Sequence, residues 1–191
     1  MLHYCWRALK KRMNNIQDIL NLIPQAITTV YKKGTIIQKS GDYKTSAIFV
    51  KKGLLKSYLI DSKGKEHIYM FAPENWIIGD LEAIQYQQPA QLFIECLEDS
   101  EVIIFEKDCL FNSELSKEQI SENAQMLHRR IGRLQRRVLM LMGAPAADRY
   151  LYFLDTYPEL PNRVPQKMIA SYLGITPQTL SSIRSEFARK K

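Results

Sequence analysis

The chain has 191 residues, and 46% of them are hydrophobic, a share that is normal for a protein with a buried core. Its three cysteines, Cys5, Cys96 and Cys109, lie far apart and form no C-x-x-C pair, so neither a disulfide framework nor a zinc site is indicated. Residues 1–11 lack the apolar core of a signal peptide, and no apolar run is long enough to cross a membrane. We therefore expect a cytoplasmic protein with no membrane partner.

The formal net charge is +7, and it is distributed unevenly. Residues 34–113 carry 8 Lys and Arg against 12 Asp and Glu, whereas residues 143–191 carry 7 against 4. An acidic middle with basic flanks argues against a uniformly basic coat for nucleic acid. It fits a chain of which only one part binds a polyanion.

The first half of the chain alternates short β-branched and aromatic runs with turns that contain glycine. Strands are predicted at residues 27–31, 35–38, 47–51, 54–60, 67–71, 91–96 and 101–105. Gly64 can adopt the positive φ that closes a hairpin after the fourth of them. Short strands at this spacing indicate an all-β sandwich or roll.

A helical pattern follows from residue 115 to residue 142, opened by a capping box of Ser116 and Gln119. Its apolar residues recur in alternating steps of four and three, which is the a/d heptad seam of a coiled coil. So narrow a seam favours parallel self-association over packing against the chain's own domain, where the apolar stripe is usually broader. The arginines on the other faces, among them Arg137, fit a solvated helix surface. The predicted dimerisation residues are Ile120, Ala124, Leu127, Ile131, Leu134, Val138 and Leu141.

Further helices are predicted at residues 146–157, 166–173 and 177–189. Gly174 ends the second of these, because a residue that tolerates positive φ closes such a turn at least cost. Thr176 can cap the third helix, and Pro177 suits its first position. Ala170 is small enough for a close helix crossing. The last two helices lie in a basic segment that follows a helix predicted to dimerise. This arrangement favours a DNA-binding helix-turn-helix over a structural hairpin.

In this order the motifs resemble the Crp/Fnr family, the relatives of the cyclic-AMP receptor protein, over almost the whole chain. The β-region carries the family's turns at residues 31–35, 40–42, 49–53 and 61–66. Residues 76–80 look like the start of its phosphate-binding cassette, and residues 97–101 look like the strand and turn after it. Residues 169–184 are similar to the short helix-turn-helix of Bacteroidetes members.

The resemblance implies an α+β fold: an N-terminal double-stranded, jelly-roll-like β-roll, a long dimerisation helix and a C-terminal helix-turn-helix of the winged-helix type. Because the chain ends at Lys191, directly after the last helix, the wing is expected to be short or absent. The resemblance further implies a homodimeric transcription regulator, not an enzyme, with double-stranded DNA and RNA polymerase as partners. The expected divisions are a helical segment at 1–26, the roll at 27–113, the dimerisation helix at 114–142 and the DNA-binding domain at 143–191.

The cassette departs from the pattern of cyclic-nucleotide binders. Those relatives hold the ribose with a Gly-Glu pair and the cyclic phosphate with an arginine after a proline, whereas here the pair is Gly79-Asp80 and Pro89 is followed by Ala90. A buried phosphate without its guanidinium loses a charge-assisted contact worth about 2 kcal/mol. The expected effector is therefore a small molecule other than cyclic AMP, or none. The expected effector pocket consists of Gly79, Asp80, Leu81, Pro89, Ala90, Gln91 and Leu92.

The exposed side of the last helix is expected to read DNA. By resemblance, the base-reading positions fall on Pro177, Gln178 and Ser182, and only Gln178 suits bidentate recognition, with adenine as its preferred partner. The neighbouring charged and hydroxyl groups are expected on phosphates, where they position the helix without specifying sequence. The predicted DNA-binding residues are Lys167, Thr176, Pro177, Gln178, Thr179, Ser181, Ser182, Arg184 and Arg189.

Neither an enzyme nor a metal protein is indicated. His3, His67 and His128 lie in three separate segments, and His67 is expected to be an ordinary strand residue. Asp80 and Glu82 are close in sequence, but carboxylates on a surface turn are usually only solvated. The chain has no nucleophile elbow, P-loop or dinucleotide-binding glycine motif, and its cysteines lack the clustered spacing of iron–sulfur relatives, so no cofactor is expected. The remaining alternative is a ligand-binding sensor or adaptor that acts through a protein partner without binding DNA.

Overall fold

A computed structural model of the chain describes residues 27–105 and 117–189. The chain divides into two compact units. One contains the described parts of Met1–Leu59 and Tyr69–Ser113, and the other contains those of Ile60–Ile68 and Glu114–Lys191. The helical segment predicted at residues 1–26 and the capping residue Ser116 lie outside the described residues, as do Cys5, Cys109 and His3.

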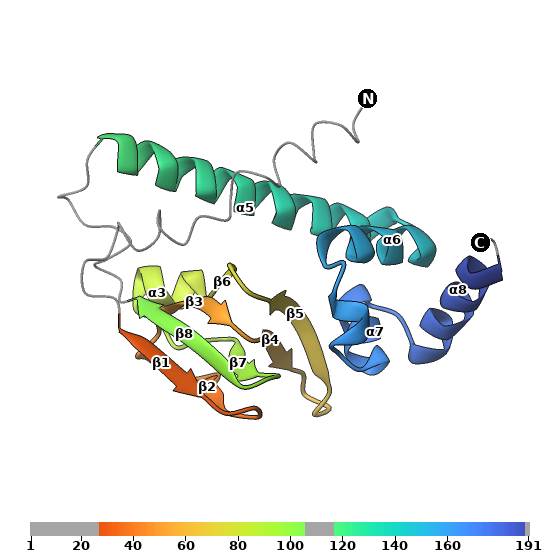
Figure 1. The fold of residues 1–191 in the computed structure, drawn as a ribbon, viewed down its shortest axis with the longest axis horizontal. Coiled ribbons are helices and arrows are strands. Elements are labelled where there is room, and N and C mark those ends of the chain that lie inside the picture. The colour runs from red at the N-terminus through yellow and green to blue at the C-terminus, as the bar shows by residue number, and fades with distance from the viewer. Residues whose placement is uncertain (1–26, 106–116, 190–191) are drawn as a thin grey trace. The chain divides into compact units, whose positions relative to one another are not determined.

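The first unit is a β-roll built from two four-stranded sheets (Figure 1). One sheet has the strand order β1-β8-β3-β6 and the other has the order β2-β7-β4-β5. Strand β3 pairs antiparallel with β8, so Ile48 lies opposite Ile104. The strands are β1 Thr28–Tyr31, β2 Ile36–Gln38, β3 Ala47–Lys52, β4 Leu55–Ile60, β5 Glu66–Ala72, β6 Ile77–Ile78, β7 Phe93–Cys96 and β8 Ser100–Phe105.

All seven strands predicted from the sequence are present, with bounds that differ by at most two residues. Two short elements, β6 and the helix α3 (Leu81–Tyr86), were not predicted. Helix α3 begins where the carboxylate of Asp80 accepts a hydrogen bond from the N–H of Ala83, which satisfies one of the free amides of its first turn. So short a helix carries too little periodicity to be recognised in a sequence.

Alternating residues of β3 supply two different parts of the roll's core. Ile48 and Val50 belong to a cluster that contains residues of both sheets, such as Leu55 and Ile94. Phe49 points to the opposite face, where it packs with Ile84 of α3. Burial of an apolar side chain of this size contributes about 1.5–3 kcal/mol, so α3 is fixed on the roll by the apolar face that it covers.

The second unit consists of the helical part of the chain together with the hairpin tip Ile60–Ile68. The predicted helices are all present, and an additional 3-10 turn, η1, follows α6 (Figure 1). After α8, no strand follows within the described residues, which end at Arg189. The helical elements are α5 Lys117–Gly143, α6 Ala146–Thr156, η1 Leu160–Asn162, α7 Gln166–Leu173 and α8 Pro177–Arg189.

Aromatic rings form the centre of the second unit. The ring centroid of Phe153 on α6 lies 5.5 Å from that of Tyr157 and 5.6 Å from that of Tyr172 on α7. Leu180 and Ile183 of α8 are buried beside this cluster's helices, as their spacing in the sequence predicts. Aromatic pairs at such distances contribute about 0.5–1.5 kcal/mol beyond the area they bury, so they hold α6 and α7 firmly together.

The hairpin tip is closed as predicted, with Gly64 at a φ of 77°. The carboxylate of Asp61 accepts hydrogen bonds from the N–H groups of Lys63 and Lys65, and its Oδ2 lies 2.7 Å from Nε2 of His67. These contacts lower the pKa of Asp61 to about 2, and the hydrogen bond with His67 is the largest cause. The prediction of an ordinary strand role for His67 is thus incomplete, because its ring pairs with the turn carboxylate.

Candidate nucleic-acid interface and effector pocket

The turn between α7 and α8 has the geometry that the sequence predicts. Gly174 has a φ of 65°, and its N–H donates to the carbonyls of the last turn of α7. Thr176 caps α8, because its Oγ1 accepts a hydrogen bond from the N–H of Thr179 at 3.1 Å. Ala170 is buried, with 1% of its surface exposed. The pair therefore has a fixed crossing angle, which is the requirement for presenting α8 to a groove.

The outer face of α8 consists of short polar side chains. Gln178 and Ser181 are exposed and make no side-chain hydrogen bond within the described part of the chain. By contrast, the Thr179 hydroxyl lies 2.9 Å from that of Thr176, and the Ser182 hydroxyl donates to the carbonyl of Gln178. Gln178 is thus the longest uncommitted hydrogen-bonding group near the start of α8.

The cationic members of the predicted DNA-binding set differ in exposure. Lys167 on α7 and Arg189 at the end of α8 are exposed, whereas Arg184 is half-buried. Exposed cations at both ends of the helix pair suit contacts with phosphates on either side of a groove.

The expected effector pocket is organised around a carboxylate that belongs to the chain itself. Asp80 is buried, with 6% of its surface exposed, which corrects the prediction that it is solvated on a surface turn. Its carboxylate accepts hydrogen bonds from three backbone N–H groups, those of Ala83 at 3.3 Å, Gln91 at 2.8 Å and Leu92 at 3.2 Å. The two segments that were predicted to bound the pocket are therefore tied together by Asp80.

These three N–H groups form an anion-binding arrangement that an internal anion already satisfies. Ala90 occupies the position after Pro89 at which cyclic-nucleotide binders carry the arginine that pairs with the phosphate. It is buried and apolar. None of the seven pocket residues carries a positive charge. A second anion placed beside the Asp80 carboxylate would meet like-charge repulsion without a compensating cation.

The predicted dimerisation seam on α5 is exposed. Ile131 has 61% of its surface exposed and Val138 has 54%, and Ile120, Leu127 and Leu141 are exposed as well. Only Ala124 and Leu134 are half-buried. Most of the apolar stripe of α5 is thus exposed, whereas a helix packed only within its own unit buries its apolar stripe.

The arginine side of α5 is where the structure departs from the sequence prediction. Arg137 is half-buried, and its Nη2 donates to the carbonyl oxygens of Ile68 and Tyr172, at 3.0 and 3.1 Å. Its guanidinium also lies over the ring of Tyr172. Arg137 is therefore part of the packing of the second unit and not a solvated surface residue, a role that helical periodicity could not reveal.

Neither a metal site nor a membrane segment is evident in the part of the chain that the structure describes. No group of three or more His, Cys, Asp and Glu side chains within residues 27–105 and 117–189 is placed to hold a metal ion. In the same ranges, no helix is both long enough and apolar enough to span a membrane.

Comparisons with known proteins agree with this geometry. Residues 28–113 match the family model of the cyclic nucleotide-binding domain. The structure is similar to FixK2 from Bradyrhizobium japonicum, at 18% identity and a TM-score of 0.74, over 87% of this chain and 86% of that one. It is also similar to a CooA mutant from Carboxydothermus hydrogenoformans, at 20% identity and a TM-score of 0.72, over 93% of this chain and 85% of that one.

A third similar structure is a transcriptional regulator of the CRP/FNR family from Thermus thermophilus, at 20% identity and a TM-score of 0.67 over 86% of this chain and 87% of that one. No curated protein gives a significant sequence match. Residues 28–113 thus match the cyclic nucleotide-binding domain, and the chain as a whole has the fold of these solved structures, one of which is a CRP/FNR-family transcriptional regulator. The predicted resemblance and fold class are confirmed at this level.

Proposed function

We propose that the chain is a homodimeric transcription regulator of the Crp/Fnr type that binds specific sites on double-stranded DNA. The observation that carries the proposal is the capped, rigid pair of α7 and α8, which exposes a polar face with a free Gln178 amide. Helix-turn-helix proteins insert such a face into the major groove, where an uncommitted amide can form two hydrogen bonds with adenine.

The exposed stripe of α5 supports the homodimer. Large aliphatic side chains at Ile131 and Val138 are more than half exposed, and burial of each against a second copy would contribute about 1.5–3 kcal/mol. An a/d repeat buries both stripes when two copies pair in parallel. A two-fold dimer of helix-turn-helix units then meets a palindromic site with half-sites one helical turn apart.

The carboxylate of Asp80 supports a roll that does not bind cyclic AMP. It accepts the N–H groups of Gln91 and Leu92, the amides closest in the sequence to the missing arginine position at Ala90. A cyclic phosphate would have to displace this carboxylate and would find no guanidinium in return. By the same fold resemblance, we take RNA polymerase as the protein partner, the cytoplasm as the location and a non-enzymatic role.

Selection from a pool of random DNA duplexes tests the proposed function. The full chain should enrich one palindromic motif, and the labelled motif should bind in a gel-shift titration. The double variant Lys167→Glu/Arg189→Glu should weaken binding at least about tenfold at physiological salt, because phosphate contacts dominate affinity. The control Lys51→Glu/Lys52→Glu makes the same charge change at two exposed lysines of the roll and should leave binding within about twofold.

Enrichment of no motif would overturn the DNA-binding proposal and favour the sensor or adaptor alternative. Equal loss in both double variants would show that affinity follows total charge and not the helix pair. Calorimetry with cyclic AMP and cyclic GMP tests the pocket separately. No heat of binding is expected, and micromolar binding of either nucleotide would overturn that part of the proposal.

A further inference from the structure

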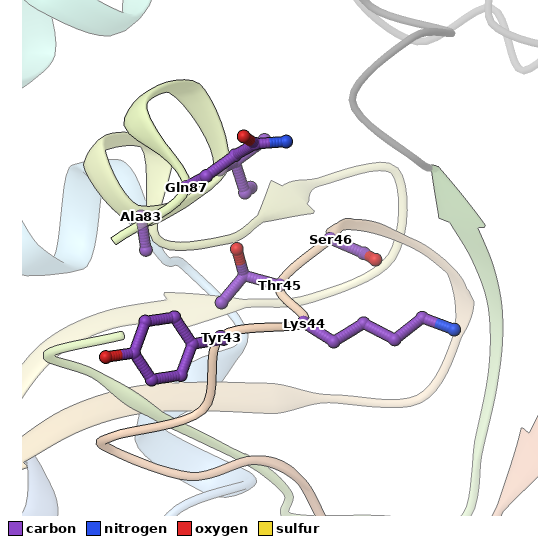
Figure 2. Close-up of a pocket in the computed structure, with 7 residues that line it drawn as sticks. Tyr43, Lys44, Thr45, Ser46, Ala83 and Gln87 are labelled. Carbon is purple, nitrogen blue, oxygen red and sulfur yellow. The ribbon is translucent and has the colours of Figure 1, made fainter. Parts of the chain in front are cut away.

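Chain segments that are far apart in the sequence approach one another in both units. In the first unit, α3 and the loop that leads into β3 enclose a hollow of about 220 Å³ (Figure 2). The Tyr43 and Lys44 side chains extend in opposite directions from this loop, so they do not converge on a common ligand. In the second unit, by contrast, groups from α5 and α7 converge on the backbone of one hairpin residue, Ile68.

Strand β5, which contains Ile68, is the edge strand of its sheet. Along such a strand, the N–H and the carbonyl of a residue point to the same side as those of the residue two positions away. At this edge the N–H of Ile68 donates to Oγ of Ser171 on α7 at 3.1 Å, and the Ser171 hydroxyl donates to the carbonyl of Glu66 at 3.0 Å. One hydroxyl of α7 therefore occupies the place that a further strand would take beside β5.

The carbonyl of Ile68 connects the same residue to α5. It accepts a hydrogen bond from Nη2 of Arg137 on α5 at 3.0 Å. The same nitrogen donates to the carbonyl of Tyr172, which follows Ser171 on α7, at 3.1 Å. Ile68 is buried, with 4% of its surface exposed. We call this arrangement the Ile68 brace: the backbone of Ile68, the hydroxyl of Ser171 and the guanidinium of Arg137. It joins α5 to α7 within the second unit.

The brace bears on DNA binding because α5 and α7 have different parts in the proposed dimer. There α5 forms the symmetric interface, and α7 supports α8, which enters the groove. The separation of the two α8 helices then depends on how each α7 is held relative to its own α5. One base pair added between the half-sites moves a half-site by about 3.4 Å along the DNA axis and rotates it by about 35°. A dimer in which α7 is held rigidly should therefore accept one spacing of the half-sites.

We propose that Ser171 is a positioning residue that restricts the dimer to palindromes of one half-site spacing. Ser171 acts through Ile68 and is not among the residues predicted to contact DNA. Without its hydroxyl, the N–H of Ile68 and the carbonyl of Glu66 lose their partner on α7, while the contacts of Arg137 remain. The inference rests on the proposed homodimeric DNA binding and extends it to the spacing of the site, which the reading residue Gln178 does not determine.

Competition titrations with three duplexes test the inference on the full chain. The duplexes carry the selected palindrome with its centre unchanged, lengthened by one base pair or shortened by one base pair. The unmodified chain should bind the altered spacings at least about thirtyfold more weakly, because one half-site is then out of register, and Ser171→Ala should reduce this penalty to about fivefold or less. The ratio of affinities is the readout. A variant that is merely less stable binds all three duplexes more weakly and leaves the ratio unchanged.

Two further variants separate the hydroxyl from the side chain that carries it. Ser171→Thr keeps a hydroxyl at this position and should keep the spacing penalty within about twofold of that of the unmodified chain. Ser62→Ala is the matched control, because Ser62 is an exposed serine of the same hairpin tip whose side chain makes no hydrogen bond within the described residues. It should also leave the penalty within about twofold.

Hydrogen exchange of the Ile68 amide tests the brace without DNA. Exchange should be slow in the unmodified chain and in Ser171→Thr, and at least about tenfold faster in Ser171→Ala. Fast exchange of this amide in the unmodified chain would overturn the brace itself. An unchanged spacing penalty in Ser171→Ala, or an equal relaxation in Ser62→Ala, would overturn the positioning role alone. If the unmodified chain bound none of the duplexes, the proposed DNA-binding function would fail and the inference with it.

Discussion

The guanidinium of Arg137 lies over the ring of Tyr172, with 3.8 Å between Cζ and the ring centroid, while its Nη2 donates to the carbonyl of the same residue. The carbonyl of the next residue, Leu173, accepts a hydrogen bond from Nη1 of Arg149 at 2.9 Å. Both carbonyls belong to the last turn of α7, where helix geometry leaves acceptors without intrahelical partners and the helix dipole favours positive charge. Arginines from α5 and α6 thus hold the end of the helix that precedes the helix-turn-helix bend.

Replacement of Arg137 by alanine should loosen α7. The variant leaves the Tyr172 carbonyl without its charged donor and removes the contact with the ring, a loss of about 2 kcal/mol in the free energy of unfolding of the second unit. Hydrogen exchange of the α7 amides, together with urea unfolding, measures the effect. Arg136→Ala is the control, because Arg136 is the exposed neighbour on the same helix.

The variant Arg137→Lys distinguishes the contribution of the positive charge from that of the planar guanidinium. Arg137→Lys keeps the charge but loses the planar group that contacts the ring and two carbonyls at once, so its stability should fall between those of the alanine variant and the unmodified chain. Equal stability of Arg137→Ala and Arg136→Ala would contradict the role given to this arginine.

The sequence predicts those parts of the fold that depend on local chemistry. Gly174, Thr176 and Pro177 define a helix end, a cap and a helix start within four consecutive residues, and the observed α7 and α8 have the predicted bounds. The strands are recognisable for the same reason, since their alternation and the glycine turns between them lie within short windows.

Roles that depend on distant residues could not be predicted. The burial of Asp80 follows from the N–H groups of Gln91 and Leu92, which are eleven and twelve positions away in the sequence. Arg137 meets carbonyls that are 35 and 69 positions away. Backbone donors and acceptors carry no residue-type signature, so a carboxylate or guanidinium that binds them has the same sequence appearance as one exposed to water.

The Asp61 carboxylate should titrate near pH 2. Its depressed pKa means that the contribution of its hydrogen bonds to hairpin stability is complete above its ordinary pKa near 3.8 and is lost as the pH falls through about 2. His67→Ala should raise the pKa of Asp61 toward the ordinary value, because the hydrogen bond with His67 is the largest cause of the shift. Carboxyl carbon NMR across an acid titration reads this pKa directly.

A second carboxylate provides the control for that titration. The pKa of Asp99 is also lowered, mainly by its hydrogen bond with Lys32. Lys32→Ala should therefore raise the pKa of Asp99 and leave that of Asp61 unchanged. If His67→Ala left the Asp61 titration where it was, the backbone N–H groups of Lys63 and Lys65 would be sufficient to hold the carboxylate ionised.

The variant Ile131→Lys should be monomeric. Ile131 occupies an a position of the α5 seam, and two lysines facing each other across a parallel pair would be both desolvated and mutually repulsive. Light scattering or sedimentation of the full chain measures the change in mass. Leu139→Lys is a matched control, because Leu139 is 60% exposed against 61% for Ile131 but lies off the a/d seam.

Both variants remaining dimeric would show that the chain associates through a different surface. Both becoming monomeric would show that exposed apolar area on α5, and not the heptad register, determines association.

The variant Gln178→Ala should discriminate less between bases at one position of the DNA site. The Gln178 amide is exposed at the start of α8 and is not engaged by other described side chains, so it can donate to and accept from the edge of an adenine. Its loss should cost about 1–3 kcal/mol on the preferred site and less on a site already mutated at that base pair. Competition titrations with single-base variants of the selected motif measure this difference.

Arg184→Ala provides the contrast to Gln178→Ala, because a phosphate contact positions the helix without reading sequence. Its binding should weaken to a similar extent on every duplex, and the slope of log affinity against log salt should become shallower by about 0.9, the contribution of one phosphate contact. The two variants thus differ in kind: one changes the motif, and the other changes only the affinity and its salt dependence. If selection with Gln178→Ala returned the same motif with the same information at every position, the exposed face of α8 would be recognising DNA by its shape alone.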